Sequence, residues 1–426
     1  MFPPSRLKWL YVDFNSYFAS VEQQLNPALR GKPVVVVPVD SDSTCAIAAS
    51  YEAKAYGIRT GTPIWEAKQN CPGLICVLAR HDAYVDYHHR AIAEINRHVP
   101  VTAVCSIDEM AARLMRNEAQ PEAARRIALA IKAGLAERLG PLVRCSIGIA
   151  ANRYLAKVAT DIEKPDGLTI LMPEEVEIRI KTLKLRDLPG IGCNMERQLN
   201  RVGIYTMSDL LALDRRDMRR VWRNIWGERM WYYLRGIDLP EQPTQRRSIG
   251  HSHVLAPALR PAHIAIDVAR RLTMKAASRL RRMGYHATVF GFSARLEDGR
   301  RVHADRKCRP AQDSMTFLSI MMGLWDHLIP QSPGPVVKKV SVVLYGLTAE
   351  ADRQLDIFEE AENYPHATPF SRSAGKWNDI SAAIDKINTR FGKDSALIGM
   401  LPVSGRSFSG TKIAFTRIPD VAEFHE

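Results

Sequence analysis

The order of apolar patterns along the 426-residue chain divides it into three structural parts. Roughly the first 170 residues mix short strand patterns with helical ones, residues 173–240 are helical with short connections, and residues 249–348 mix both patterns again. Strands mixed with helices in this way favour an α+β fold, in which helices cover sheets. A chain of this length exceeds one ordinary core, so we expect a multidomain α+β protein.

A segment rich in Pro, Gln and Arg, "DLPEQPTQRRS" at 238–248, separates the helical part from the second mixed part. Its composition is typical of an extended, basic tether. An Asp-Gly turn in "LEDGRR" predicts a hairpin between the middle strands of the part that follows. The expected order there is strand, helix, strand, strand, helix and strand, at 249–255, 261–283, 286–296, 300–307, 311–329 and 338–346. One more helix is predicted at 376–391.

The charge balance points to a polyanionic partner. Lys and Arg outnumber Asp and Glu by 59 to 46, a formal net charge of +13 that most simply suits nucleic acid. No stretch of about 18 apolar residues is present, and Asp13 interrupts the short apolar run at the start. We therefore expect a cytoplasmic protein without a membrane span. The 7 cysteines lack paired ligand spacing, which favours free thiols and no zinc site.

Three acidic residues follow predicted strands. Asp13 ends the strand predicted at 8–13, and Asp108 with Glu109 ends the buried strand predicted before them. An Asp-Glu pair at a strand end is most simply a solvated turn, because both residue types are usually exposed. Alternatively, neighbouring strands bring the three carboxylates together, where they can hold two divalent cations for in-line phosphoryl transfer. The spacing alone leaves both interpretations open.

Four motifs in fixed order resemble those of the Y-family translesion DNA polymerases: "YVDFNSYFASVE", "AASYEAKAYGIRTG", "CSIDE" and "SIGIAANRYLAKVATDIEKPDG". The resemblance covers roughly residues 8–348 and includes a helix-hairpin-helix element in "LPGIG". It implies a right-hand polymerase with a small fingers domain and a little finger of β-α-β-β-α-β pattern. The implied boundaries are palm 1–31 and 79–172, fingers 32–78, thumb 173–240, linker 241–248, little finger 249–348 and tail 349–426.

The resemblance implies a low-fidelity polymerase that extends a primer 3′ end past lesions as a monomer, using primer-template DNA and deoxynucleoside triphosphates. It places two Mg²⁺ ions on Asp13, Asp108, Glu109 and the Phe14 carbonyl oxygen. Phe18 matches the steric gate against a ribose 2′-hydroxyl. The residues implied to contact the triphosphate are Tyr17, Phe18, Tyr51, Lys54 and Lys164, and those implied to contact the DNA backbone are Gly190 and Gly192.

Each of these positions also has a plain structural interpretation. Phe18 and Tyr51 are also compatible with core packing, Lys54 with a solvated charge, and Lys164 and the glycines with tight turns. Many family members have Arg where this chain has Lys54, and Asn15 is typical of the polymerase V-like branch while the Tyr of "SYEAK" is typical of the polymerase IV-like branch. Two rival functions remain: an inactive polymerase-like scaffold that binds DNA, and a nucleotide cyclase with a similar palm sheet.

The segment "RQLDIF" at 353–358 resembles the short peptide by which bacterial polymerases dock on the sliding clamp. Its Gln354, Leu355, Ile357 and Phe358 supply the orienting amide and apolar anchors that such a peptide needs. The alternative is an amphipathic segment that packs on its own domain. A sliding clamp is thus an expected partner.

Overall fold

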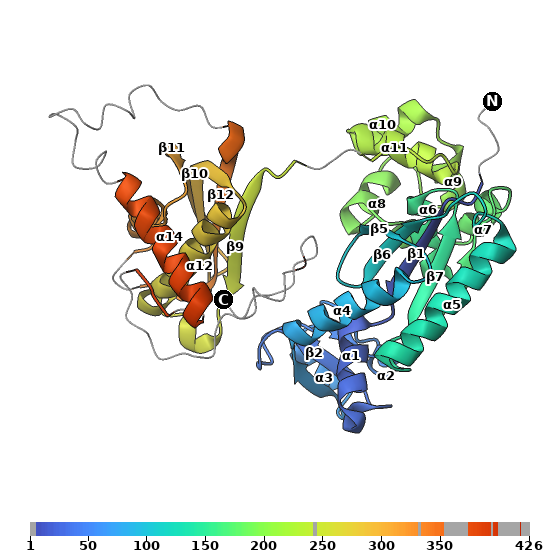
Figure 1. Ribbon diagram of the computed structural model, residues 1–426, viewed down its shortest axis with the longest axis horizontal. Helices are drawn as coiled ribbons and strands as arrows, with labels where there is room; N and C mark the ends of the chain where they lie inside the picture. The colour runs from blue at the N-terminus through green and yellow to red at the C-terminus, as the bar shows by residue number, and fades with distance from the viewer. Residues whose placement is uncertain are drawn as a thin grey trace. The chain divides into compact units, whose positions relative to one another are not determined.

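The computed structural model describes residues 6–241, 245–330, 334–352, 374–392, 395–398 and 418. Contacts divide the described residues into two units, the first of residues 6–241 with Ile418 and the second of residues 245–398, and each unit is described separately (Figure 1). Among the described residues, no helix is long and apolar enough to cross a membrane.

A five-stranded sheet forms the centre of the first unit. Its strand order is β5-β6-β1-β7-β8. The central strands β1 and β7 are buried along their whole length, whereas the edge strand β5 alternates between half-buried and exposed residues. The strands are β1 (Trp9–Phe14), β5 (Val101–Val104), β6 (Glu109–Arg113), β7 (Cys145–Ala150) and β8 (Leu168–Ile170).

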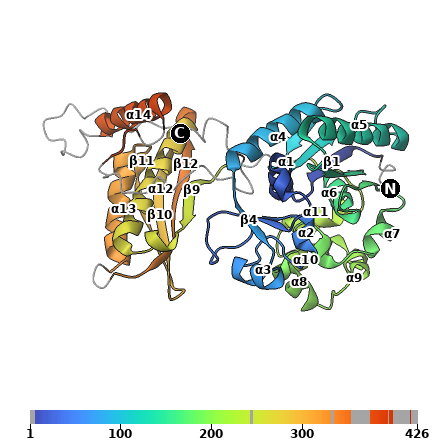
Figure 2. The same ribbon diagram turned by 90° about the horizontal axis from the view of Figure 1, so that it is seen from below.

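Helices cover both faces of this sheet. Leu10 and Val12 of β1 share a core with α1, α4 and α5, which lie on one face (Figure 2). Trp9 and Tyr11, whose side chains point the other way, pack with α6 and the helical part that follows. Asp13 has the same parity as Trp9 and Tyr11, so it belongs to the α6 face. The helices are α1 (Tyr17–Leu25), α4 (His81–Ile95), α5 (Pro121–Leu139) and α6 (Arg153–Ile162).

Gly148 allows α6 to approach the sheet closely. A Cβ at this position of β7 would lie 2.0 Å from the carbonyl oxygen of Ala156. Asn152 then starts the helix, because its side chain accepts a hydrogen bond from the Leu155 N–H at 2.8 Å. The same amide donates to the Tyr233 carbonyl oxygen at 2.9 Å, which ties the helical part to the sheet.

A small three-stranded sheet, in the order β3-β2-β4, has its own core around Val35, Ile58 and Ile64. It consists of β2 (Val34–Val37), β3 (Ala48–Ala49), β4 (Ile75–Leu78), α2 (Tyr51–Lys54) and α3 (Ile64–Asn70). The helical part expected after residue 172 contains α7 (Val176–Lys181), α8 (Cys193–Asn200), α9 (Met207–Ala212), α10 (Arg215–Trp222) and α11 (Ile225–Leu234).

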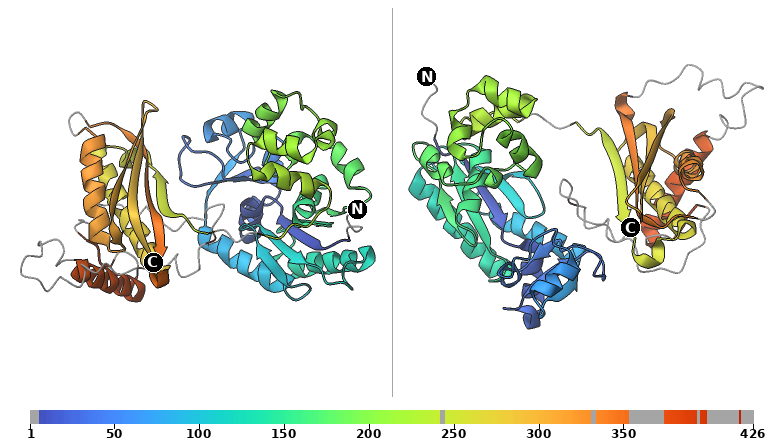
Figure 3. Two further views of the ribbon diagram at one scale, coloured as in Figure 1. Left: turned by 90° about the horizontal axis from the view of Figure 1, so that it is seen from above. Right: turned by 180° about the vertical axis from the view of Figure 1, so that it is seen from behind.

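The second unit has the predicted order of elements. An antiparallel sheet, β11-β10-β12-β9, packs against two helices around Phe290, Phe317 and Trp325 (Figure 3). The elements are β9 (Ser248–Val254), α12 (Ala262–Arg282), β10 (Tyr285–Leu296), β11 (Arg301–Ala311), α13 (Ser314–Leu328) and β12 (Val337–Ala349). The Asp-Gly hairpin joins β10 and β11 as expected.

The helix predicted near residue 376 is also present, as α14 (Ala374–Phe391). The Arg281 guanidinium donates to both carboxylate oxygens of Asp385, at 2.8 and 3.0 Å. The Ser314 N–H donates to the Ser381 hydroxyl at 3.1 Å. These contacts hold α14 against the helical layer of the second unit.

The prediction that a strand ends at Asp108 and Glu109 was wrong. β5 ends at Val104, residues 105–108 form a turn, and Glu109 begins β6. The turn closes because the N–H groups of Cys105 and Ser106 both donate to the Glu109 carbonyl oxygen, at 2.9 and 3.1 Å. Asp108 therefore lies in a hairpin turn, and Glu109 is the first residue of the returning strand.

Candidate functional site

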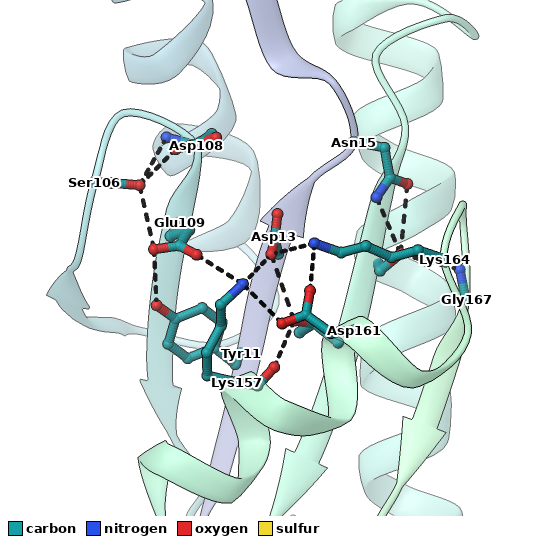
Figure 4. A network of polar contacts seen from close by, with 12 residues as sticks. Tyr11, Asp13, Asn15, Ser106, Asp108, Glu109, Lys157, Asp161, Lys164 and Gly167 are labelled. Carbon is teal, nitrogen blue, oxygen red and sulfur yellow. Dashed lines mark hydrogen bonds and ion pairs between the residues drawn. The ribbon is translucent and has the colours of Figure 1, made fainter. Parts of the chain in front are cut away.

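The strand register brings the three acids to one end of the five-stranded sheet. Asp13 lies directly opposite Glu109 in the β1–β6 pair, and the Phe14 N–H donates to the Asp108 carbonyl oxygen at 2.9 Å. Burial raises the pKa of Asp108; the Ser106 hydroxyl, 2.6 Å away, acts to lower it, and the charges of Asp13 and Glu109 raise it further. The three carboxylates thus form one acidic cluster (Figure 4).

Two lysines lie among these acids. Lys157 on α6 contacts Asp13, lies 2.8 Å from Glu109 Oε1 and also reaches Asp161 at 3.4 Å. Lys164, just after α6, lies 2.7 Å from Asp13 Oδ2 and 2.6 Å from Asp161 Oδ1 (Figure 4). Burial acts to lower the pKa of Lys157, but the charges of Asp13, Asp161 and Glu109 outweigh it and raise the pKa well above the ordinary lysine value. Lys157 therefore stays protonated and positively charged at neutral pH.

Sequence reasoning missed Lys157 and Asp161. Both lie within the motif "YLAKVATDIEKPDG", and their spacing of four residues puts them on one side of α6. This side of α6 lies away from the buried Leu155 and Val158, and Lys164 follows soon after the helix ends at Ile162. This spacing of charged residues along α6 was the signal in the sequence that could have indicated both residues.

The loop that carries Lys164 is fixed by hydrogen bonds from the sheet. The Asn15 side chain accepts from the Asp166 N–H at 2.8 Å and donates to the Ser146 hydroxyl at 3.1 Å. That hydroxyl accepts from the Gly167 N–H at 3.3 Å. Gly167 is required, because a Cβ there would lie 1.8 Å from the Glu163 carbonyl oxygen. Asn15 is thus a supporting residue of the site (Figure 4).

Phe18 is half-buried and stacks on a fully buried ring. The Phe18 and Tyr84 ring centroids are 4.3 Å apart with an interplanar angle of 13°. The Tyr84 hydroxyl donates to Glu22 Oε1 at 2.7 Å, and Glu22 is paired with Arg80. This buried network sets the plane of the Phe18 ring while leaving part of the ring accessible.

Tyr51 and Lys54 lie on α2, beside the small three-stranded sheet of the first unit. The Lys54 ammonium lies 4.4 Å from the centroid of the Tyr51 ring, a cation–π contact. Burial, followed by the charge of Lys164, lowers the pKa of Lys54, and burial raises the pKa of the Tyr51 hydroxyl.

Gly190 and Gly192 belong to the helical part and not to the strands that carry the acids. Gly190, in the turn before α8, has φ +94°, which favours glycine, and a Cβ there would lie 3.3 Å from Trp226 Nε1. Gly192 leaves open space where a Cβ would lie. The four positions of the clamp-like peptide, Gln354, Leu355, Ile357 and Phe358, fall outside the described residues.

His88 on α4 holds the turn that carries Asp108. Its Nδ1 lies 2.7 Å from the Ile107 carbonyl oxygen, and burial lowers the pKa of His88 to about 4. The imidazole is therefore neutral at pH 7, and its Nδ1–H donates to that carbonyl.

We expect His88 to make the folded state sensitive to acid. Its pKa is about 4 when folded and near 6.5 when unfolded, so the unfolded chain binds more protons between these values and stability rises with pH across that window. Below about pH 4 no further loss from this group follows. The full difference corresponds to about 3 kcal/mol. Urea unfolding of wild type and His88→Asn at pH 7, 5.5 and 4.5 measures it, and equal pH slopes in the two proteins would contradict the assignment.

The donor set suits a hard divalent cation, because carboxylate oxygens are the ligands that Mg²⁺ prefers. In the described part of the chain, however, no three His, Cys, Asp or Glu side chains are arranged to hold a metal directly. One oxygen of Asp13 and one of Glu109 instead contact lysine ammonium groups.

Three family descriptions match successive parts of the chain. They are the impB/mucB/samB family at residues 12–161, the thumb domain of DNA polymerase-iota at 186–238, and the impB/mucB/samB family C-terminal domain at 246–357.

Curated relatives match almost the whole chain. The DNA polymerase IV of Pelotomaculum thermopropionicum is 31% identical over 397 residues, which covers 91% of this chain and 94% of that protein. DNA polymerase IV 1 of Bacillus subtilis is 30% identical and covers 90% of each chain. Among solved structures, a chimera of the Y-family polymerases Dbh and Dpo4 has a TM-score of 0.68 at 25% identity and covers 80% of this chain and 99% of that one.

A sheet that carries an acidic cluster at its end, a small second sheet, a helical part and a tethered α+β unit define a right-hand polymerase. The chain belongs to the Y-family of DNA polymerases. It is a DNA-directed DNA polymerase of the translesion class. The matches to thumb and C-terminal domain disfavour the cyclase alternative, and the relatives disfavour an inactive scaffold.

Proposed function

We propose that the protein extends a primer by two-metal-ion chemistry in which Asp13, Asp108 and Glu109, with the Phe14 carbonyl oxygen, hold two Mg²⁺ ions. The observation that supports this most is the register of β1 and β6, which pairs Asp13 with Glu109 beside Asp108. Bound there, the ions would lower the pKa of the primer 3′-hydroxyl and neutralise the triphosphate. Family membership supports a divalent metal in general.

Lys164, Tyr51 and Lys54 supply the nucleotide contacts in this proposal. Lys164 is held beside the cluster by a loop pinned to Asn15, so its ammonium is positioned before a triphosphate arrives. The first N–H groups of α1, at Tyr17 and Phe18, have no acceptor within the helix and suit phosphate oxygens. The incoming triphosphate would thus meet fixed donors on two sides.

Primer-template DNA is the proposed macromolecular substrate. One solved neighbour is an insertion ternary complex of Dbh DNA polymerase, with a TM-score of 0.53 at 25% identity. In this chain, exposed cations on β11 suit a sequence-independent phosphate contact. They are Arg301, Arg306, Lys307 and Arg309. Gly190 and Gly192 would let backbone N–H groups approach a DNA phosphate. We infer that the protein acts as a monomer in the cytoplasm.

A primer-extension assay tests the function. Purified protein with Mg²⁺ and the four deoxynucleoside triphosphates is expected to extend a primer on undamaged DNA and past a lesion that stops a high-fidelity polymerase. Omission of template should abolish the reaction, because base pairing selects the nucleotide. Failure to extend an undamaged primer at any Mg²⁺ concentration would refute the proposal.

The tail segment at 353–358 is the proposed clamp-binding peptide. Two or three apolar anchors in a preformed pocket would tether the polymerase and raise its effective concentration at the primer end. A synthetic peptide of residues 350–362 is expected to bind sliding clamp, and the same peptide with Leu355 and Phe358 changed to Ala is expected to bind at least about tenfold more weakly. Fluorescence anisotropy measures both. Equal binding, or none by either peptide, would remove the clamp as a partner.

A further inference from the structure

One side chain, Lys157, joins the two facing strand ends of the acidic cluster. Its ammonium contacts Asp13 on β1 and lies 2.8 Å from Glu109 Oε1 on β6, and only 18% of the side chain is exposed. The Tyr11 ring lies beneath it, with the Lys157 nitrogen 5.8 Å from the ring centroid. The Tyr11 hydroxyl also donates to the other oxygen of Glu109, at 3.3 Å. Lys157 is therefore held in place from several sides.

The charges around Lys157 are not balanced. The carboxylates of Asp13, Glu109 and Asp161 outnumber the ammonium groups of Lys157 and Lys164 that contact them, and Asp108 adjoins Glu109 in the chain. Lys164 reaches Asp13 and Asp161, whereas Lys157 contacts both Asp13 and Glu109 and so links the two strand ends. Without it, these two carboxylates would face each other across the strand pair and repel.

We propose that Lys157 is the resident counter-cation of the acidic cluster and that a divalent cation has to displace its ammonium from Asp13 and Glu109. The inference rests on the proposed metal-binding role of these acids. A carboxylate oxygen in contact with an ammonium cannot also ligate a metal at full strength, because the two cations repel at short range. The protein alone would therefore bind divalent metal weakly.

Asp161 gives the displaced ammonium a place to remain. It lies one helical turn after Lys157, at 3.4 Å from it, and already pairs with Lys164. The flexible lysine stem allows the ammonium to shift toward Asp161 without movement of the helix. A triphosphate that enters with the metal adds negative charge for both lysines. Lys157 thus couples metal binding to nucleotide binding and disfavours loading with metal alone.

The test measures Mn²⁺ binding to the DNA-free and nucleotide-free protein by electron paramagnetic resonance at constant ionic strength. Lys157→Gln is expected to bind Mn²⁺ about tenfold more tightly than wild type, and Lys157→Arg within about twofold of it, because Arg keeps the charge. Lys181→Gln is the matched control, since Lys181 pairs with Glu177 on an exposed surface and loses the same charge away from the cluster. It should bind Mn²⁺ like wild type.

Glu109→Gln distinguishes a failure of the counter-cation inference from a failure of the proposed metal site. If Glu109→Gln loses Mn²⁺ binding and Lys157→Gln binds no more tightly than wild type, the counter-cation inference is overturned and the proposed metal site stands. If Glu109→Gln binds Mn²⁺ like wild type, the metal site itself is wrong and the inference fails with it. Tighter binding by both Lys157→Gln and Lys181→Gln would show a general charge effect and would also overturn the inference.

A measurement on the unaltered chain covers the case in which Lys157→Gln does not fold. In wild-type protein labelled with ¹³C at lysine Cε, the Lys157 resonance is identified as the one absent from Lys157→Arg. Saturation with Mg²⁺ is expected to shift this resonance and to leave that of Lys181 unchanged. A Lys157 resonance that stays fixed while Mg²⁺ binds would contradict displacement.

Discussion

Replacement of Asp108 by Asn, or of Glu109 by Gln, is expected to lower the rate of nucleotide addition by about a thousandfold or more. Each change removes a ligand charge from the proposed two-metal site, which contributes several kcal/mol to transition-state stabilisation. Binding of primer-template DNA should change by less than about twofold, because it depends on phosphate contacts elsewhere. Single-turnover extension and a DNA titration with each variant measure the two effects separately.

The amide replacements keep the local hydrogen bonds as far as possible. Ser106 donates to Asp108 and Tyr11 to Glu109, and an amide oxygen can still accept both. Glu177→Gln on the exposed surface of α7 is the matched control, since it loses one carboxylate charge outside the cluster. Extension at the wild-type rate by either cluster variant would exclude that residue from the site. Loss of DNA binding in parallel with extension would indicate a folding defect.

Local sequence patterns were sufficient to predict the order of helices and strands in the second unit. Its alternating strands, its two amphipathic helices and the Asp-Gly turn of the β10–β11 hairpin depend on interactions between residues close in sequence. The pairing of β12 with both β10 and β9 joins strands that are not consecutive in the chain, so these local patterns do not determine it. The same reasoning found α14, but not the contact between Arg281 and Asp385, which lie 104 residues apart.

The turn at residues 105–108 could not be predicted in this way. The apolar residues on both sides of it read as one continuous strand, so nothing local shows where the chain reverses. The reversal depends on the Glu109 carbonyl oxygen and on His88 of α4, which lies 19 residues before its partner Ile107 in the sequence. The error moved Asp108 and Glu109 from the end of one strand to the turn and start of the next, while their closeness to Asp13 was expected correctly.

Lys157 shows a second limit of sequence reasoning. A lysine on the polar side of an amphipathic helix is usually solvated, and the spacing to Asp161 is that of an ordinary surface pair. Its place in the cluster arises because α6 crosses the sheet at Gly148, close enough to bring a helical side chain to Asp13. That crossing depends on the three-dimensional packing of the whole first unit.

Phe18→Ala is expected to raise incorporation of ribonucleotides by about 10- to 100-fold relative to deoxynucleotides. The proposed gate works by overlap between the Phe18 ring and a 2′-hydroxyl, and forced overlap costs about 1–3 kcal/mol. The ring can act in this way because it stacks on the Tyr84 ring, with 4.3 Å between the ring centroids, and Tyr84 is itself held by a hydrogen bond to Glu22. Competition between ribo- and deoxynucleoside triphosphates in single-nucleotide insertion measures the ratio.

The core-packing alternative for Phe18 makes a different prediction. If the ring only fills space, Phe18→Ala should lower stability and insertion of both sugars together, with an unchanged ratio. A half-buried ring should cost less than the roughly 3–5 kcal/mol of a fully buried Phe→Ala change, so the folded variant remains measurable. Trp65→Ala is the control, because Trp65 is an aromatic residue that is 55% exposed on α3. We expect the ratio to rise in Phe18→Ala, to rise less in Phe18→Leu and to stay unchanged in Trp65→Ala. This result would assign sugar discrimination to the size of the side chain at position 18. An unchanged ratio in both Phe18 variants would leave Phe18 as a packing residue.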